Sequence, residues 1–165
     1  MPRQPLPFDP VERAAEEWQQ RFGPADRMRA VTALMRVHQL VLMQMDELLR
    51  PLGLTFARYE VLVLLSFSRR GAVPLGKIGE RLQVHATSVT PLVKGLEVAG
   101  LIDRRPHPDD GRAVLASLTD AGREVLRKAT DLIQEAEFGL GALTPEECDR
   151  LSALLVKPRA EAGDF

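Results

Sequence analysis

Apolar residues recur at helical spacing along most of the chain and predict a series of amphipathic helices. The first runs from about Pro10 to Arg21, because Asp9 can cap it and its apolar residues share one face: Val11, Ala14, Ala15, Trp18 and Phe22. Prolines crowd residues 1–7, and Gly163-Asp164-Phe165 follows Pro158, so both ends are expected to be frayed.

A long helix from Asp26 to about Leu49 carries apolar residues on two faces. One stripe consists of Leu34, Val37, Val41, Met45 and Leu48, and the other of Val31, Met35, Leu42 and Leu49, with His38 among them. Two apolar faces need two partners. The pattern therefore predicts that one face packs on the chain's own core and the other on a second subunit.

The middle of the chain is divided into shorter elements. Thr55 is expected to cap a helix whose buried face consists of Phe56, Tyr59, Leu62, Val63 and Phe67. Two short helices follow, from Leu75 to Leu82 and from about Thr87 to Ala99, and a turn at residues 83–85 joins them as a helix-turn-helix. The second helix is expected to start at Thr87 or Ser88, because that start places Pro91 in the first turn.

A predicted β-hairpin comes next, and two helices complete the fold. Residues 101–105 and 113–118 form its strands around a polar loop at 106–112, which makes the hairpin a candidate wing. Thr119 and Thr144 are expected to cap the last two helices. The expected fold class is therefore mainly α with a small β-hairpin wing (α+β), which is a winged helix-turn-helix.

Composition adds a local charge asymmetry. The chain has 165 residues with 22 basic and 23 acidic side chains, so its net charge of −1 indicates no particular partner. Residues 69–112, however, carry eight basic and five acidic side chains, whereas residues 113–165 carry six and ten. The positive excess coincides with the helix-turn-helix and hairpin, where contacts with DNA phosphates would lie.

The same composition indicates a cytoplasmic protein. The N-terminal segment lacks the apolar core of a signal peptide, and the longest apolar runs are too short to cross a bilayer. The single cysteine, Cys148, cannot form an internal disulfide. No cofactor, metal or membrane partner is expected.

Four ordered motifs closely resemble the MarR-type winged-helix transcription regulators. They are LQVHATSVT at 82–90, VKGLEVAGLIDRR at 93–105, PDDGR at 108–112 and LTDAG at 118–122, and weaker similarity extends over residues 26–157. The resemblance implies that residues 26–157 form the winged-helix domain, with a DNA-binding lobe at 54–118 and dimerisation helices at 26–50 and 119–157. Residues 1–25 are then an N-terminal extension, and 158–165 a tail.

The resemblance also implies an obligate homodimer that binds a palindromic, double-stranded DNA operator, more commonly as a repressor. The second helix of the helix-turn-helix lies in the major groove. Its expected DNA contacts, with the turn before it, are His85, Thr87, Ser88, Thr90, Pro91 and Lys94. Thr87 or Ser88 could instead only cap the helix.

In the wing, Asp110-Gly111-Arg112 fits the family's Asp-x-Arg pattern, in which the arginine enters the minor groove and the aspartate orients it. The alternative is an ion pair that closes the turn. Family members often carry arginine at the middle position, so Gly111 removes one positive charge. Arg104 and Arg105, at the base of the wing, are expected to contact phosphates or intramolecular partners.

Members of this family commonly respond to a small phenolic or anionic effector. Candidate lining residues are Trp18, His38, Arg58 and Tyr59, although packing, interface or surface roles explain each of them better. A redox response through a cysteine near the N-terminus does not carry over, because the only cysteine is Cys148.

Two other classes of protein were weighed. An enzyme is disfavoured because the three histidines are scattered and no nucleophile elbow, metalloprotease motif or phosphate loop is present. His107-x-Asp109-Asp110 is better explained as a solvated wing tip than as a metal site. A winged helix used only for protein contacts is the remaining alternative, and the hydroxyl-rich helix favours DNA over it.

Overall fold

The computed structural model describes residues 6–165, except for the side chains of residues 86, 111 and 112, and it divides the chain into two compact units. The first unit ends at Gln44 and contains α1 (Pro10–Phe22) and most of α2 (Asp26–Leu49). Asp9 caps α1 by accepting a hydrogen bond from the backbone N–H of Val11 at 2.8 Å. Glu12 and Arg29 form an ion pair of 3.3 Å between the two helices. Both predicted helices are confirmed.

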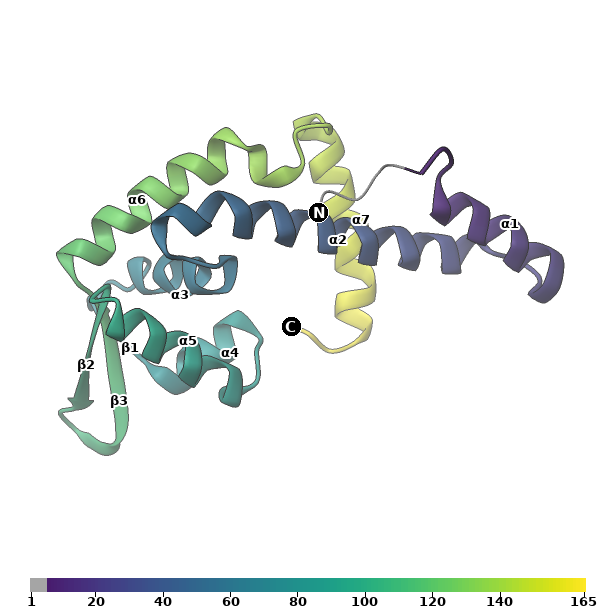
Figure 1. Cartoon of the computed structure of the whole chain (residues 1–165). Coiled ribbons are helices and arrows are strands. Elements are labelled where there is room, and N and C mark those ends of the chain that lie inside the picture. Colours follow the sequence, from purple (N-terminus) through teal and green to yellow (C-terminus); the bar gives the residue numbers. More distant parts are fainter. Residues whose placement is uncertain (1–5) are drawn as a thin grey trace. The chain divides into compact units, whose positions relative to one another are not determined.

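The second unit is built around α3 (Phe56–Ser66). This helix contacts α4 (Leu75–Leu82), α5 (Ala86–Val98), α6 (Asp120–Glu135) and strand β3 (Asp110–Leu118). In Figure 1, α3 lies between α6 on one side and α4 and α5 on the other. Its side chains at Tyr59, Val61, Leu62 and Leu65 are buried. The prediction of a buried Phe67 was wrong, because the helix ends at Ser66 and the Phe67 side chain is 73% exposed.

Three strands form a small antiparallel sheet in the order β1-β3-β2. Strand β2 (Ile102–His107) and β3 are the predicted hairpin, but they extend into the expected loop, so that only residues 108–109 connect His107 to Asp110. The sequence analysis missed β1 (Val73–Pro74), which pairs with residues 115–116 of β3. Two residues are too short to show a strand periodicity.

The threonine caps are confirmed. Thr55 accepts a hydrogen bond from the N–H of Arg58 at 3.3 Å, and Thr144 forms a reciprocal capping box with Glu147 at the start of α7 (Pro145–Glu161). Two short 3-10 helices, η1 (Arg50–Leu52) and η2 (Glu137–Gly139), follow α2 and α6. Within residues 6–165, no helix has the length and apolar character needed to cross a membrane.

The C-terminal residues are anchored rather than frayed. The side-chain amide of Gln83 donates to the main-chain oxygen of Asp164 at 3.1 Å and to its Oδ1 at 2.6 Å. Arg159 donates to the Oδ2 of Asp164 at 2.6 Å and lies over the ring of Phe165. The prediction of a frayed C-terminus was wrong, because it considered only composition. The prediction of a frayed N-terminus falls largely on residues 1–5, which lie outside the described part of the chain.

A polar junction joins α5, the sheet and α6. The hydroxyl of Thr119 donates to the carbonyl of Gly100 at 2.8 Å and accepts from the N–H of Gly122 at 2.9 Å. The N–H of Thr119 donates to the carbonyl of Leu101 at 3.1 Å. Gly122 approaches so closely that an added Cβ would lie 1.9 Å from the Leu101 carbonyl oxygen. Only glycine fits at this position without a backbone shift.

We expect Gly122→Ala to destabilise the fold by ~2–3 kcal/mol, because the methyl group would collide with backbone rather than with a movable side chain. Urea unfolding monitored by circular dichroism measures the change. Gly76→Ala is the matched control, since its Cβ would meet nothing within 4 Å. That control should be neutral or slightly stabilising, because alanine favours a helix by about 1 kcal/mol over glycine. Equal effects at the two positions would contradict the junction's role.

Candidate nucleic-acid interface

Helices α4 and α5 form the predicted helix-turn-helix. Gln83 ends α4 in the left-handed conformation at φ 54°, and its N–H donates to the Gly79 carbonyl. His85 is the N-cap of α5: its Nδ1 lies 2.8 Å from the hydroxyl of Thr87 and accepts from the Thr87 N–H at 3.4 Å. The alternative in which Thr87 or Ser88 caps the helix is therefore wrong, because the imidazole of His85 performs that role two residues before Thr87.

The start of α5 at Ala86 changes the position of Pro91. The proline is the sixth residue of the helix rather than a first-turn residue, so the expected start was too late. Proline lacks the N–H that would bond to the carbonyl four residues before it, here that of Thr87. Both residues are exposed, so the helix accepts this loss on its outer face and not in the core.

Helix α5 presents a polar face opposite its packed face. Val89, Val93 and Leu96 are buried, with at most 3% of each side chain exposed. The proposed contact residues all lie on exposed positions of the turn and helix: His85, Thr87, Ser88, Thr90, Pro91 and Lys94. A helix with hydroxyl and ammonium groups along its free side can meet both bases and phosphates.

The wing places its proposed contacts at two ends of the hairpin. At the tip, the N–H of Asp109 donates to Nδ1 of His107 at 3.1 Å, which closes the turn before Asp110. The side chain of Arg112 lies outside the described residues, so its predicted minor-groove role stays a prediction. At the base, Arg104 forms an ion pair of 3.0 Å with Glu97 of α5. Arg105 is exposed beside it.

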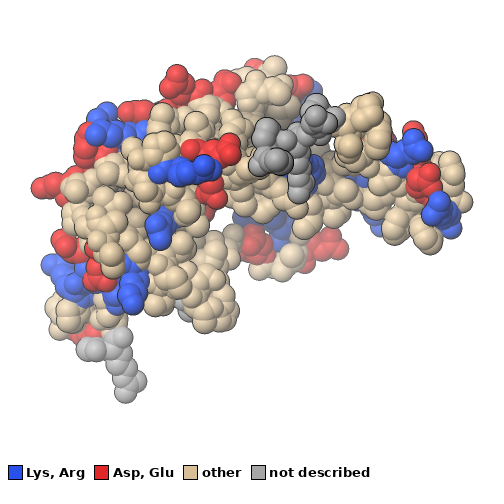
Figure 2. All heavy atoms as spheres, in the orientation of Figure 1, with Lys and Arg blue, Asp and Glu red and all other residues tan. Residues whose placement is uncertain are grey.

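The Arg104–Glu97 pair has a consequence for the charge of the interface. It connects the sheet to α5 and occupies one of the arginines that was expected to contact phosphate or an intramolecular partner. On the face shown in Figure 2, basic and acidic side chains alternate over the end of the molecule that carries β2 and β3. The hairpin and the face of α5 therefore do not form a region of one charge.

The four candidate effector residues are divided between the two units, with Trp18 and His38 in the first and Arg58 and Tyr59 in the second. Trp18 packs on Phe22 within α1 at 4.9 Å between ring centroids, and His38 is exposed on α2. Arg58 donates to the carbonyl of Gly53 at 3.4 Å, and its guanidinium fills the space where a side chain at Gly95 would lie. Tyr59 lines a hollow in the second unit, and its hydroxyl is 3.3 Å from that of Thr130.

That hollow, which we call the apolar groove, has a volume of about 350 Å³. It lies between α3, α4 and η2, and is lined by Phe56, Tyr59, Glu60, Val63, Leu64, Phe67, Arg81, Leu82 and Phe138. Its wall is mostly aromatic and aliphatic, with one basic and one acidic residue. Tyr59 is the one lining residue among the predicted effector contacts, because Arg81, Leu82 and Phe138 meet the face of α3 only in the tertiary structure.

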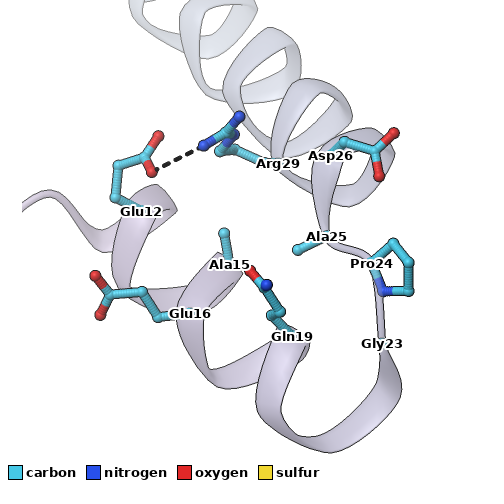
Figure 3. Close-up of a pocket in the computed structure, with 9 residues that line it drawn as sticks. All are labelled: Glu12, Ala15, Glu16, Gln19, Gly23, Pro24, Ala25, Asp26 and Arg29. Carbon is cyan, nitrogen blue, oxygen red and sulfur yellow. Dashed lines mark hydrogen bonds and ion pairs between the residues drawn. The ribbon is translucent and has the colours of Figure 1, made fainter.

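A larger hollow of about 580 Å³ lies in the first unit, where α1 turns into α2. Figure 3 shows Glu12, Glu16 and Gln19 on α1 around it, and Asp26 and Arg29 on α2. Arg29 is already paired with Glu12. Three carboxylates against one arginine disfavour an anionic ligand, and neither Trp18 nor His38 contributes to the lining.

The helix-turn-helix of α4 and α5 and the β2–β3 wing together define a winged helix-turn-helix protein. The MarR family model matches residues 54–114. The organic hydroperoxide resistance transcriptional regulator of Bacillus subtilis is 34% identical over 112 residues, which cover 68% of this chain and 74% of that protein. The chain therefore belongs to the MarR family, and it is a transcriptional regulator rather than an enzyme.

Solved structures agree with this assignment. A MarR family transcriptional regulator from Streptomyces coelicolor is 50% identical, with a TM-score of 0.78 over 85% of this chain and 97% of that one. A mutant MarR from E. coli, solved with operator DNA, is 25% identical, with a TM-score of 0.70 over 80% of this chain and 94% of that one.

The Glu60 carboxyl provides a test of the apolar groove. Partial burial raises its pKa, so the folded state carries an electrostatic cost once Glu60 is ionised. Glu60→Gln removes that cost and preserves helix propensity. We expect the variant to have the higher Tm at pH 7. The difference should shrink as the pH falls toward about 3, below the ordinary glutamate pKa of about 4.3, where the wild-type carboxyl is protonated in both the folded and unfolded states. A difference in Tm that does not change with pH would contradict this explanation.

Proposed function

We propose that this protein is a sequence-specific DNA-binding repressor that acts as a homodimer on a palindromic operator. The observation that carries the proposal is the exposed row of Thr87, Ser88, Thr90 and Lys94 on α5, which is held in place by buried Val89, Val93 and Leu96. Hydroxyl and ammonium groups at the N-terminal half of a recognition helix are placed to contact base edges and phosphates. The E. coli relative solved with operator DNA supports the same use of the fold.

Exposed apolar side chains on α2 support the dimer. Within the first unit, six large apolar residues of this helix are 39–58% exposed: Val31, Leu34, Met35, Val37, Leu40 and Met43. Large apolar side chains that stay exposed along a helix of this length typically mark an interface. A second copy of the chain is the proposed partner, and two copies of α5 would then enter major grooves about one helical turn apart, roughly 10 base pairs.

The apolar groove is the proposed effector site. A phenolic compound fits a wall of aromatic and aliphatic side chains, and Arg81 is available to an anionic substituent. Of the four effector contacts expected from the sequence, the proposed site includes Tyr59. A molecule bound between α3 and α4 would contact α4, the first helix of the helix-turn-helix.

A peroxide response is not part of the proposal, although the B. subtilis relative is named for organic hydroperoxide resistance. The chain has one cysteine, Cys148, in the first turn and a half of α7. It lies on a different element from the α5 interface and from the apolar groove.

Operator binding tests the proposal through Lys94 and Arg112. A mobility-shift assay on the DNA upstream of the protein's own coding sequence should show a specific complex at fixed salt. Lys94→Ala and Arg112→Ala should each weaken it by about 1–3 kcal/mol, because each removes a cationic contact with a base edge or groove. Lys157→Ala, on the exposed end of α7, is the charge-matched control and should bind as wild type.

Two results would contradict the proposal. The first is a wild-type protein that binds operator and scrambled duplexes equally, which would favour a winged helix used for protein contacts. The second is unchanged operator affinity in both variants, which would remove the α5 and wing assignments together.

Calorimetric titration of a phenolic and purine panel tests the effector site. A compound that binds in the apolar groove should lose affinity roughly tenfold or more in Phe138→Ala, because the groove loses an aromatic wall. Phe165→Ala is the control, since that ring is exposed at the C-terminus and does not line the groove. Ligand binding that survives Phe138→Ala unchanged would place the effector elsewhere.

A further inference from the structure

A second hollow in the DNA-binding lobe is lined by basic side chains. It has a volume of about 400 Å³ and lies between the segment after α3, strand β1 and helix α4. Arg69, Arg70, Lys77 and Arg81 line it, together with Phe67, Ser68, Ala72, Val73 and Pro74. We call it the basic hollow. All four basic residues are exposed, and none of them is among the DNA contacts expected from the sequence.

The positive charge of this hollow is largely unbalanced. Lys77 is paired with Glu80 at 2.6 Å, but none of the three arginines has an ion pair among the described residues. Residues 66–85 carry four basic and one acidic side chain, whereas residues 86–112, which include α5 and the hairpin, carry four of each. The whole positive excess of the lobe therefore belongs to the segment that forms the basic hollow.

The backbone at the start of α4 also favours an anion in the basic hollow. Pro74 is the N-cap of α4, and no side chain caps this helix. The first N–H groups of a helix carry partial positive charge and attract anions. Pro74 and Lys77, which both line the hollow, place this first turn at its edge.

We propose that the basic hollow binds a phosphate group, and that in the complex this group belongs to the DNA backbone beside the base pairs read by α5. The inference rests on the proposed DNA-binding function. In a helix-turn-helix the first helix crosses the backbone while the second occupies the groove. Helix α4 is that first helix, and Lys77 and Arg81 lie one turn apart on it. Such contacts add affinity and orientation without reading sequence.

The basic hollow also adjoins the apolar groove. Phe67 and Arg81 line both. A guanidinium that is paired with an anionic ligand in the groove is withdrawn from a phosphate in the hollow. The two sites therefore compete for Arg81, which gives an anionic effector a direct route to weaken DNA binding.

The salt dependence of DNA binding tests the phosphate site. Fluorescence anisotropy with the operator and a scrambled duplex is measured over a salt series for wild type and for Arg69→Ala/Arg70→Ala in the full chain. We expect the double variant to lose affinity for both duplexes by a similar factor, roughly tenfold. The slope of log K against log salt should become shallower by about 2, because a dimer loses one phosphate contact in each subunit.

Arg123→Ala/Arg150→Ala is the matched control. It removes the same charge from exposed positions on α6 and α7 that line neither hollow, and it should leave the slope unchanged. A slope that is equal in wild type and in Arg69→Ala/Arg70→Ala would overturn the phosphate site while leaving operator recognition intact. If wild type binds neither duplex, the proposed function itself fails, and the phosphate site fails with it.

A second measurement distinguishes backbone phosphate from free phosphate. Inorganic phosphate is titrated against wild type and the Arg69→Ala/Arg70→Ala variant at constant ionic strength, with chloride as the balancing anion. Weak binding that the operator duplex displaces supports the backbone site. Saturable phosphate binding in wild type, lost in the variant without any change in the slope for DNA, would assign the hollow to a free phosphate and overturn the backbone assignment.

Discussion

The junction at Thr119 holds together the parts of this protein that must act at one interface. The Thr119 hydroxyl bonds to the Gly100 carbonyl, just after α5, and to the Gly122 N–H in the first turn of α6. The Thr119 N–H bonds to the carbonyl of Leu101, the residue before β2. Gly122 lets these segments approach until backbone touches backbone. The orientation of α5 and the direction of the wing are therefore fixed at the same point. An angular change of α6 would be transmitted to both, because no flexible linker separates them.

The distribution of charge within the lobe separates specificity from general affinity. The exposed face of α5 offers hydroxyl groups and one lysine, and the nearby Arg104 is partly neutralised by Glu97. A surface of this kind has little attraction for arbitrary DNA and relies on matched contacts. Long-range attraction to DNA then depends on other residues, and the proposal assigns it to Arg69 and Arg70, which have no ion pair among residues 6–165 as described.

Much of the fold could be predicted from the sequence, because its signals are local. Caps at Asp9, Thr55, Thr119 and Thr144 mark helix starts through side chains within three residues, and apolar spacing marks the buried faces. The exceptions arise where tertiary structure decides. His85 caps α5 although histidine is rarely read as a cap, and β1 forms only because β3 offers it an edge.

The candidate site was predicted less completely for the same reason. The polar face of α5 follows from periodicity, so its residues could be named in advance. The apolar groove is lined by residues from segments that are far apart in sequence, such as Tyr59 with Phe138. The basic hollow is formed within residues 67–81, but its shape depends on how the segment after α3, strand β1 and α4 fold against one another. The fixed contact of Arg58 with Gly95 likewise depends on how α3 crosses α5. The spacing of residues along the sequence does not predict tertiary contacts of this kind.

The position of α4 fits both proposed roles of the lobe, DNA binding and a response to an anionic effector. Its buried side, at Ile78 and Gly79, anchors it in the core, while Lys77 and Arg81 border the basic hollow and Arg81 and Leu82 border the apolar groove. The C-terminal Asp164 is bonded to Gln83 directly after this helix. Helix α4 is thus held by its buried side and by the hydrogen bond at its C-terminal end, while its exposed side chains border both hollows. Under the proposal, a shift of the Arg81 side chain alone would change the charge that faces DNA while α5 keeps its packed position, and this is a smaller change than the rotation of a whole domain.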